Sequence, residues 1–121
     1  MVRKSAVLIV EDDTMTRELL CCAVDACGFE AHGCEDGIAA LAAATERCFD
    51  CAITDYRMPN MNGLELTRRL RALFPALLVI GASIEDKKKE FLEAGADGFR
   101  LKPLRIEDID ALLSLIRMMR P

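Results

Sequence analysis

Short apolar runs alternate with amphipathic stretches along the whole of this chain. The runs have the length of strands buried on both faces, whereas the stretches between them carry apolar residues at helical spacing. Strands that alternate with helices in this way imply a parallel sheet with helices on both faces. The predicted strands cover residues 6–10, 29–33, 51–54, 77–80 and 98–101. The sequence therefore predicts one doubly wound α/β domain over residues 1–121.

Apolar residues at intervals of three or four define the predicted helices between these strands. Met15, Leu19 and Val24 belong to the apolar stripe of the first helix, and Ile38 and Leu41 to that of the second. The predicted helices cover residues 14–27, 36–47, 62–74, 85–94 and 106–120.

Charge and hydropathy exclude several classes of protein. The net charge is −4, and acids and bases are interspersed, so the chain offers no basic field for direct contact with nucleic acid. The run Lys87–Lys89 is best explained as a solvated helix face. No apolar run reaches the ~20 residues that a membrane span requires, and the first residues do not resemble a signal peptide. We therefore expect a cytoplasmic protein without a membrane partner.

Six cysteines are distributed over the first half of the chain. Cys48 and Cys51 form a C-x-x-C pair, but no second pair accompanies them, and Cys51 opens a predicted strand. A metal or redox site would need a second pair or a helix N-terminus. We expect buried structural thiols rather than disulfides, since nothing indicates secretion.

Polar residues follow four of the predicted strands. In open parallel sheets the chemistry lies at the carboxyl ends of the strands. Strand one ends at residues 11–13, three consecutive acids, and strand three ends at Asp55. Strand four ends near Ser83, and strand five ends at Lys102. These residues are expected to converge on one crevice.

Several carboxylates in one crevice repel each other unless a cation joins them. Oxygen ligands without histidine or cysteine indicate Mg²⁺. A nearby ammonium and a hydroxyl would neutralise and hydrogen-bond a phosphoryl group, and a central carboxylate can act as the nucleophile that forms an aspartyl phosphate.

Three segments of the chain together resemble the receiver domain of two-component response regulators. Residues 7–13 followed by Arg17 look like its opening, residues 55–63 like its phosphorylation loop, and residues 94–103 like its last strand and lysine. The three occur in the family's order and span nearly the whole chain. The resemblance implies a flavodoxin-like, five-stranded parallel sheet with strand order 2-1-3-4-5.

The resemblance also implies the roles of the site residues. Asp55 would accept the phosphoryl group and bind Mg²⁺. Asp12 would be a direct metal ligand, and Glu11 would act mostly through water. The backbone carbonyl of Arg57 would supply a further ligand, and Lys102 would contact the phosphoryl oxygens.

A switch and a set of partners follow from the same resemblance. Phe99 would turn inward when the hydroxyl of Ser83 moves toward the phosphate, and Pro103 would follow a cis peptide bond. The donor would be a sensor histidine kinase or a phosphotransfer protein, and the target a downstream protein or output domain. A homodimer through the fourth helix, fifth strand and fifth helix is compatible with it. The domain would catalyse only its own phosphorylation and dephosphorylation.

Each assignment has an ordinary structural alternative. Asp13 is the alternative metal ligand, although the register of Arg17 favours the preceding residue. Ser83 is also a plausible helix cap, and Phe99 a core residue. His32, the only histidine, is expected to be an exposed side chain away from the crevice.

Other functions fit the sequence less well. A phosphatase of the haloacid dehalogenase type needs a second acid two residues after the nucleophile, where this chain has Arg57. A flavodoxin-like FMN carrier needs a phosphate-binding loop, where this chain has the acids of residues 11–13. A receiver-like adaptor that is not phosphorylated remains the principal rival.

One feature departs from the family's usual pattern at the mouth of the site. The segment from Ser83 to Gly95 is short, and the bulky Ile84 follows the switch hydroxyl. Arg57 and Glu85 overlook the approach of water to an aspartyl phosphate. In one interpretation they pair across the mouth and prolong the phosphorylated state; in the other, Arg57 points into solvent.

Overall fold

A single parallel sheet forms the centre of the computed structural model, which describes residues 5–119. The strand order is β2-β1-β3-β4-β5, and every neighbouring pair is parallel. The strands are β1 (Ala6–Val10), β2 (Glu30–Cys34), β3 (Cys51–Asp55), β4 (Leu78–Ser83) and β5 (Gly98–Leu101). The predicted class and strand order are confirmed.

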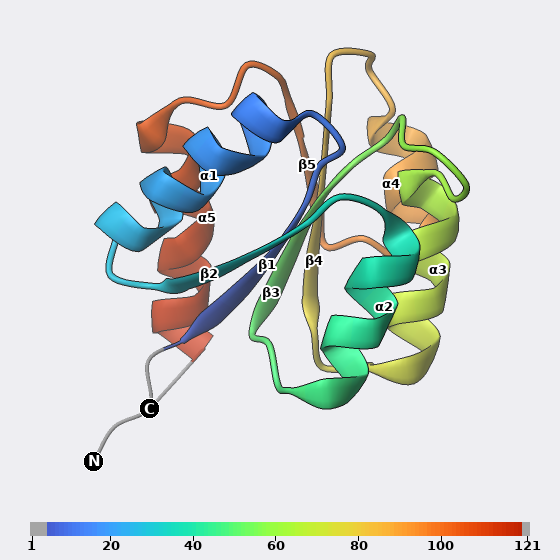
Figure 1. Ribbon diagram of the computed structural model, residues 1–121, viewed down its shortest axis with the longest axis horizontal. Coiled ribbons are helices and arrows are strands. Elements are labelled where there is room, and N and C mark those ends of the chain that lie inside the picture. The colour runs from blue at the N-terminus through green and yellow to red at the C-terminus, as the bar shows by residue number, and fades with distance from the viewer. Residues whose placement is uncertain (1–4, 120–121) are drawn as a thin grey trace.

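Five helices cover the two faces of this sheet. The helices α1 and α5 lie on one face, and α2, α3 and α4 lie on the other (Figure 1). The helices are α1 (Thr14–Ala26), α2 (Gly37–Glu46), α3 (Gly63–Leu73), α4 (Lys88–Ala94) and α5 (Ile106–Met119). None of the helices in residues 5–119 is long and apolar enough to span a bilayer.

Alternate residues of the strands supply two separate cores. Val7 and Ile9 of β1 face the layer of α1 and α5, whereas Leu8 and Val10 face α2, α3 and α4. All five residues of β1 are at most 1% exposed. This burial on both faces explains why the strands are continuous apolar runs rather than alternating ones.

The fourth helix begins three residues later than predicted. α4 starts at Lys88 rather than at Glu85, and its N-cap, Lys87, makes no side-chain capping hydrogen bond. The backbone N–H of Glu85 instead donates to Ser83 Oγ at 3.1 Å. The residues before α4 therefore form a loop tied to the end of β4, not a first helical turn.

The apolar stripes of the first two helices were predicted only in part. In α1 Val24 is buried, but Met15 and Leu19 are 71% and 66% exposed. In α2 the alanines at positions 40, 43 and 44 face the sheet, and Ile38 is 59% exposed. Small residues allow α2 to approach the sheet closely, so the largest apolar side chain is not the one that is buried.

All six cysteines are free, and only two of them match the expectation of burial. Cys34 and Cys51 are buried, and burial raises the pKa of the Cys34 thiol to about 11. Burial also raises the pKa of the Cys51 thiol. Cys22 and Cys48 are exposed, which corrects the prediction of buried thiols for them.

Candidate functional site

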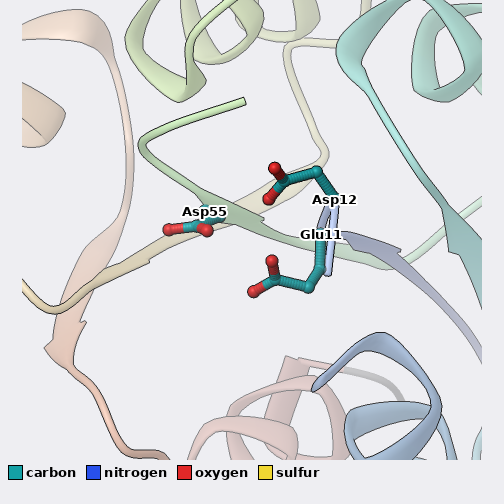
Figure 2. A group of neighbouring side chains, drawn as sticks. All are labelled: Glu11, Asp12 and Asp55. Atoms are coloured by element: carbon teal, nitrogen blue, oxygen red, sulfur yellow. The ribbon is translucent and has the colours of Figure 1, made fainter. Parts of the chain in front are cut away.

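Three carboxylates meet at the carboxyl edge of the sheet. Glu11 and Asp12 directly follow β1, and Asp55 ends β3. Val10 of β1 pairs with Thr54 of β3, and this register brings the next residues of both strands together. One oxygen atom from each carboxylate lies within 4.8 Å of the others. The three side chains point into the same space (Figure 2).

Lys102 balances part of this negative charge. Its Nζ lies 3.2 Å from Asp55 Oδ2 and forms a close ion pair with Glu11 Oε1. The side chains of Lys102, Glu11 and Asp55 are 14%, 3% and 15% exposed. Burial opposes the charge of Lys102, but the two carboxylates prevail and raise its pKa above the usual value. The buried Glu11 is thus tolerated because it has a cationic partner.

The backbone around Lys102 is fixed by β4. Its N–H donates to the carbonyl of Ser83 at 2.9 Å, which continues the pairing of β4 and β5. The peptide bond from Lys102 to Pro103 is cis, as the resemblance implied.

The structure separates the roles of the two consecutive aspartates. Asp13 is the N-cap of α1, and its Oδ2 accepts hydrogen bonds from Thr16 N at 2.8 Å and Thr16 Oγ1 at 2.7 Å. These hydrogen bonds lower the pKa of Asp13. Asp12 is exposed, but desolvation by its neighbours, followed by a hydrogen bond and the charge of Glu11, raises its pKa. Asp12 therefore faces the acidic group, whereas Asp13 is committed to the helix.

The donor set fits a hard divalent cation. Within residues 5–119, Glu11, Asp12 and Asp55 are the one group of three or more acidic, histidine or cysteine residues close enough to share a metal ion. All three offer oxygen, which Mg²⁺ prefers, and carboxylates this close together favour a cation among them.

Arg17 holds the turn that carries the acidic pair. Its Nη1 donates to the carbonyl of Glu11 at 2.8 Å. The side chain passes over Gly33 of β2, where an added Cβ would lie 3.1 Å from Arg17 Cγ. Gly33 of β2 thus leaves room for the Arg17 side chain. In the sequence, Arg17 served only to fix the alignment of the acidic pair.

The mouth of the site is bridged by an ion pair. Arg57 Nη2 donates to Glu85 Oε2 at 3.1 Å, and Arg57 Nε makes a second, shorter bond to Oε1. The pKa of Glu85 is lowered, chiefly by this hydrogen bond. Ile84 beside it is 82% exposed. The predicted pairing of Arg57 with Glu85 is confirmed, whereas its effect on the lifetime of the phosphorylated state stays a prediction.

Of the two predicted switch residues, Ser83 lies beside this mouth and Phe99 lies on β5. Ser83 is 3% exposed at the end of β4, and its Oγ accepts the N–H of Glu85 rather than capping α4. Phe99 is half-buried and packs against Phe91, with 5.6 Å between ring centroids. His32 is also half-buried, because it makes an edge contact with Phe49 at 5.8 Å; the prediction of an exposed side chain is wrong.

A cavity of about 840 Å³ contains the site. One side carries the three carboxylates and Lys102, and the other is apolar. The apolar wall consists of Leu19, Leu20 and Ala23 of α1 with Leu104, Ile106 and Ile109. This wall was not predicted, because the apolar stripe of α1 gave no sign that part of it lines a cavity.

Family comparison gives this arrangement a class. A model of the response regulator receiver domain matches residues 7–114. The match covers most of the chain, which therefore belongs to the response regulator receiver domain family. It is a receiver domain of the two-component type, similar to the chemotaxis protein CheY.

Individual relatives agree with this assignment. The sensor histidine kinase RcsC of Escherichia coli (strain K12) is 33% identical over 112 residues, which are 90% of this chain and 12% of that protein. The transcriptional regulatory protein FixJ of Bradyrhizobium diazoefficiens is 31% identical over 125 residues, which cover 100% of this chain and 61% of that protein. The chain thus spans only part of the length of these relatives.

A solved structure shows the same fold. The chemotaxis protein CheY4 of Vibrio cholerae superposes with a TM-score of 0.88 at 28% sequence identity. The alignment covers 94% of this chain and 99% of CheY4.

Proposed function

We propose that this domain accepts a phosphoryl group on Asp55 in a Mg²⁺-dependent reaction and passes the resulting conformational signal to a partner. The observation that carries the proposal is a group of three carboxylates, two of which pair with one lysine: Lys102 Nζ lies 3.2 Å from Asp55 Oδ2 and also contacts Glu11. The donor would be the phosphohistidine of a sensor kinase or phosphotransfer protein. The P–N bond of the donor breaks as a bond forms between phosphorus and a carboxylate oxygen of Asp55.

The contacts of Asp55 distinguish its two oxygens and favour Oδ2 as the nucleophile. Oδ1 accepts the N–H of Tyr56 at 2.8 Å, while Oδ2 faces Lys102. Asp12, Asp55 and the carbonyl of Arg57 would hold Mg²⁺, with Glu11 acting through water. When bound, the metal would neutralise charge on the transferring phosphoryl group.

Two further side chains would act on the phosphoryl group itself. The ammonium of Lys102 would contact its oxygens, and the hydroxyl of Ser83 would donate a hydrogen bond to it. Because Ser83 Oγ now only accepts the N–H of Glu85, its own proton is available for this role.

The surface around the site supports protein partners on two sides. The apolar wall of the cavity adjoins Asp55, where a phosphodonor protein must approach. The elements α4, β5 and α5 each expose a leucine, namely Leu92, Leu101 and Leu115, at 42–54%. We propose this second face for the downstream target, output domain or a second receiver. The domain itself would turn over no substrate except its own aspartyl phosphate.

Acetyl phosphate with Mg²⁺ provides the direct test. We expect intact mass spectrometry to show the addition of one phosphoryl group to the parent and none to Asp55→Asn. The matched control is Asp36→Asn. Asp36 is the N-cap of α2, and asparagine is also a good capping residue. Unmodified parent protein would favour the adaptor function, and full modification of Asp55→Asn would refute the assignment.

A further inference from the structure

Phe91 of α4 fills a space that two glycines leave open. Its side chain is 0% exposed. A Cβ added to Gly81 of β4 would lie 2.5 Å from the ring, and one added to Gly63 of α3 would lie 3.0 Å from Cζ. The same Cβ on Gly63 would lie 2.0 Å from the carbonyl oxygen of Asp55. The ring is therefore seated directly beneath the backbone of the phosphoacceptor.

Phe91 also lies between two other aromatic rings. The Tyr56 ring makes an edge contact with it at 6.5 Å, and the Phe99 ring a tilted contact at 5.6 Å. Tyr56 directly follows Asp55, and its N–H holds Asp55 Oδ1. Phe99 belongs to β5. The aromatic row Tyr56–Phe91–Phe99 thus extends from the phosphoacceptor turn to the edge of the sheet.

We propose that Phe91 is the residue that couples Asp55 to Phe99 and β5, so that α4 moves with the signal. This inference rests on the proposed function. The Phe91 ring contacts that of Phe99, so an inward turn of Phe99 would press on the Phe91 ring. The ring is fully buried and lies against Gly81 of β4 and Gly63 of α3. A shift of Phe91 must therefore displace the helix that carries it.

The start of α4 suits such a displacement. The helix has only seven residues and lacks a side-chain N-cap. The loop before it is tied to the phosphoacceptor loop by the pair of Arg57 and Glu85. A change at Asp55 thus reaches α4 at two points, and α4 is the two-state element that the site can bias.

A size swap tests the packing on which this inference depends. Gly81→Met should clash with the ring, and Phe91→Ala should leave a cavity, so each single variant should melt at a lower temperature than the parent. The double variant moves the bulk from α4 to β4 and should melt above both singles. If the fall in Tm of the double variant equals the sum of the falls in the two single variants, the two side chains do not share one space.

The coupling itself is measured by amide chemical shifts. Beryllium fluoride with Mg²⁺ serves as the phosphoryl analogue, and its addition to the parent should shift amides at Tyr56, at Phe99 and in α5. In the size-swap variant the shift at Tyr56 should persist, whereas the shift at Phe99 should fall several-fold. Phe91→Leu, which keeps apolar bulk without a ring, should show the same separation if the swap variant does not fold. Glu93→Ala on the exposed side of α4 is the control and should retain both shifts.

The outcomes distinguish the two proposals. If Phe99 responds as strongly in the Phe91 variants as in the parent, the signal passes by another route, such as Ser83, and the role of Phe91 is refuted. If the parent shows no shift even at Tyr56, the proposed function is refuted, and the coupling has no signal to carry.

Discussion

Lys102→Met should destabilise the domain strongly in the absence of Mg²⁺. The substitution keeps an unbranched apolar stem but removes the ammonium that lies between Glu11 and Asp55. Glu11, with 3% of its side chain exposed, is then left buried without a cation. Two further carboxylate groups remain close by, so the folded state gains uncompensated repulsion.

The magnitude follows from the distance and the burial. Unit charges 3.2 Å apart interact by about 5 kcal/mol at an effective dielectric constant of about 20. Desolvation offsets part of this attraction, but removal of one partner from a buried pair costs about 3–5 kcal/mol. Since Lys102 and Asp55 keep 14% and 15% exposure, we expect the lower end, about 3 kcal/mol. In a domain of this size that loss corresponds to a fall in Tm of about 10–15 °C.

Urea unfolding in EDTA at pH 7, followed by far-ultraviolet circular dichroism, measures this loss. Lys88→Met removes an exposed lysine and should change the free energy of unfolding by less than about 0.5 kcal/mol. The cost of Lys102→Met should shrink in a Glu11→Gln background, because the buried charge is then absent. A loss below about 1 kcal/mol, or an equal loss in both backgrounds, would refute the reasoning.

The pH dependence of the free energy of unfolding tests independently whether Lys102 causes this loss. The pKa of Lys102 is raised in the folded state, so its contribution is fully present below the unfolded pKa of about 10.4 and is lost as the pH rises through the folded value. The difference in stability between the parent and Lys102→Met should therefore stay constant from neutral pH to about pH 10. It should then close at higher pH. If the difference in stability disappeared at low pH instead, the effect would belong to another group.

Three other sets of substitutions test further parts of the structure. Asp12→Ala should weaken Mg²⁺ binding, measured by the fluorescence of the single tyrosine. Asp13→Ala should lower Tm and leave Mg²⁺ binding nearly unchanged. The reverse ranking would show that the two aspartates are misassigned. Arg57→Asn combined with Glu85→Gln should shorten the lifetime of the aspartyl phosphate, and a decay no faster than in the parent would rule out a guarding role. Arg71→Ala should lower the free energy of unfolding by about 3 kcal/mol, because its guanidinium donates to three backbone carbonyls and a carboxylate; an unchanged urea midpoint would contradict this.

The sheet and the acidic group were predictable because their causes are local in sequence. β1 is apolar at every position, as a strand covered on both faces must be, and its end fixes the place of Glu11 and Asp12. The rule that chemistry lies at the carboxyl ends of parallel strands then brings Asp55 and Lys102 to the same place. Each of these inferences needs only one strand and its first following residue.

The start of α4 was not predictable because its cause is not local. Glu85 has a good helical propensity, and nothing in its own segment excludes it from a helix. Its side chain is instead engaged by Arg57, which is 28 residues away in sequence, and its N–H by Ser83. Likewise, Phe91 was not singled out, since its importance depends on glycines in two other elements.

Two apolar residues that were assigned to the stripe of α1, Met15 and Leu19, are exposed rather than buried. Leu19 and Ile84 line the cavity of the phosphoacceptor, and Met15 lies on the same helix as Leu19, yet all three are more than 60% exposed. Helical periodicity identifies an apolar face but cannot say whether the sheet or a partner covers it. Exposed apolar residues beside the site are what the proposed binding of a protein partner would require.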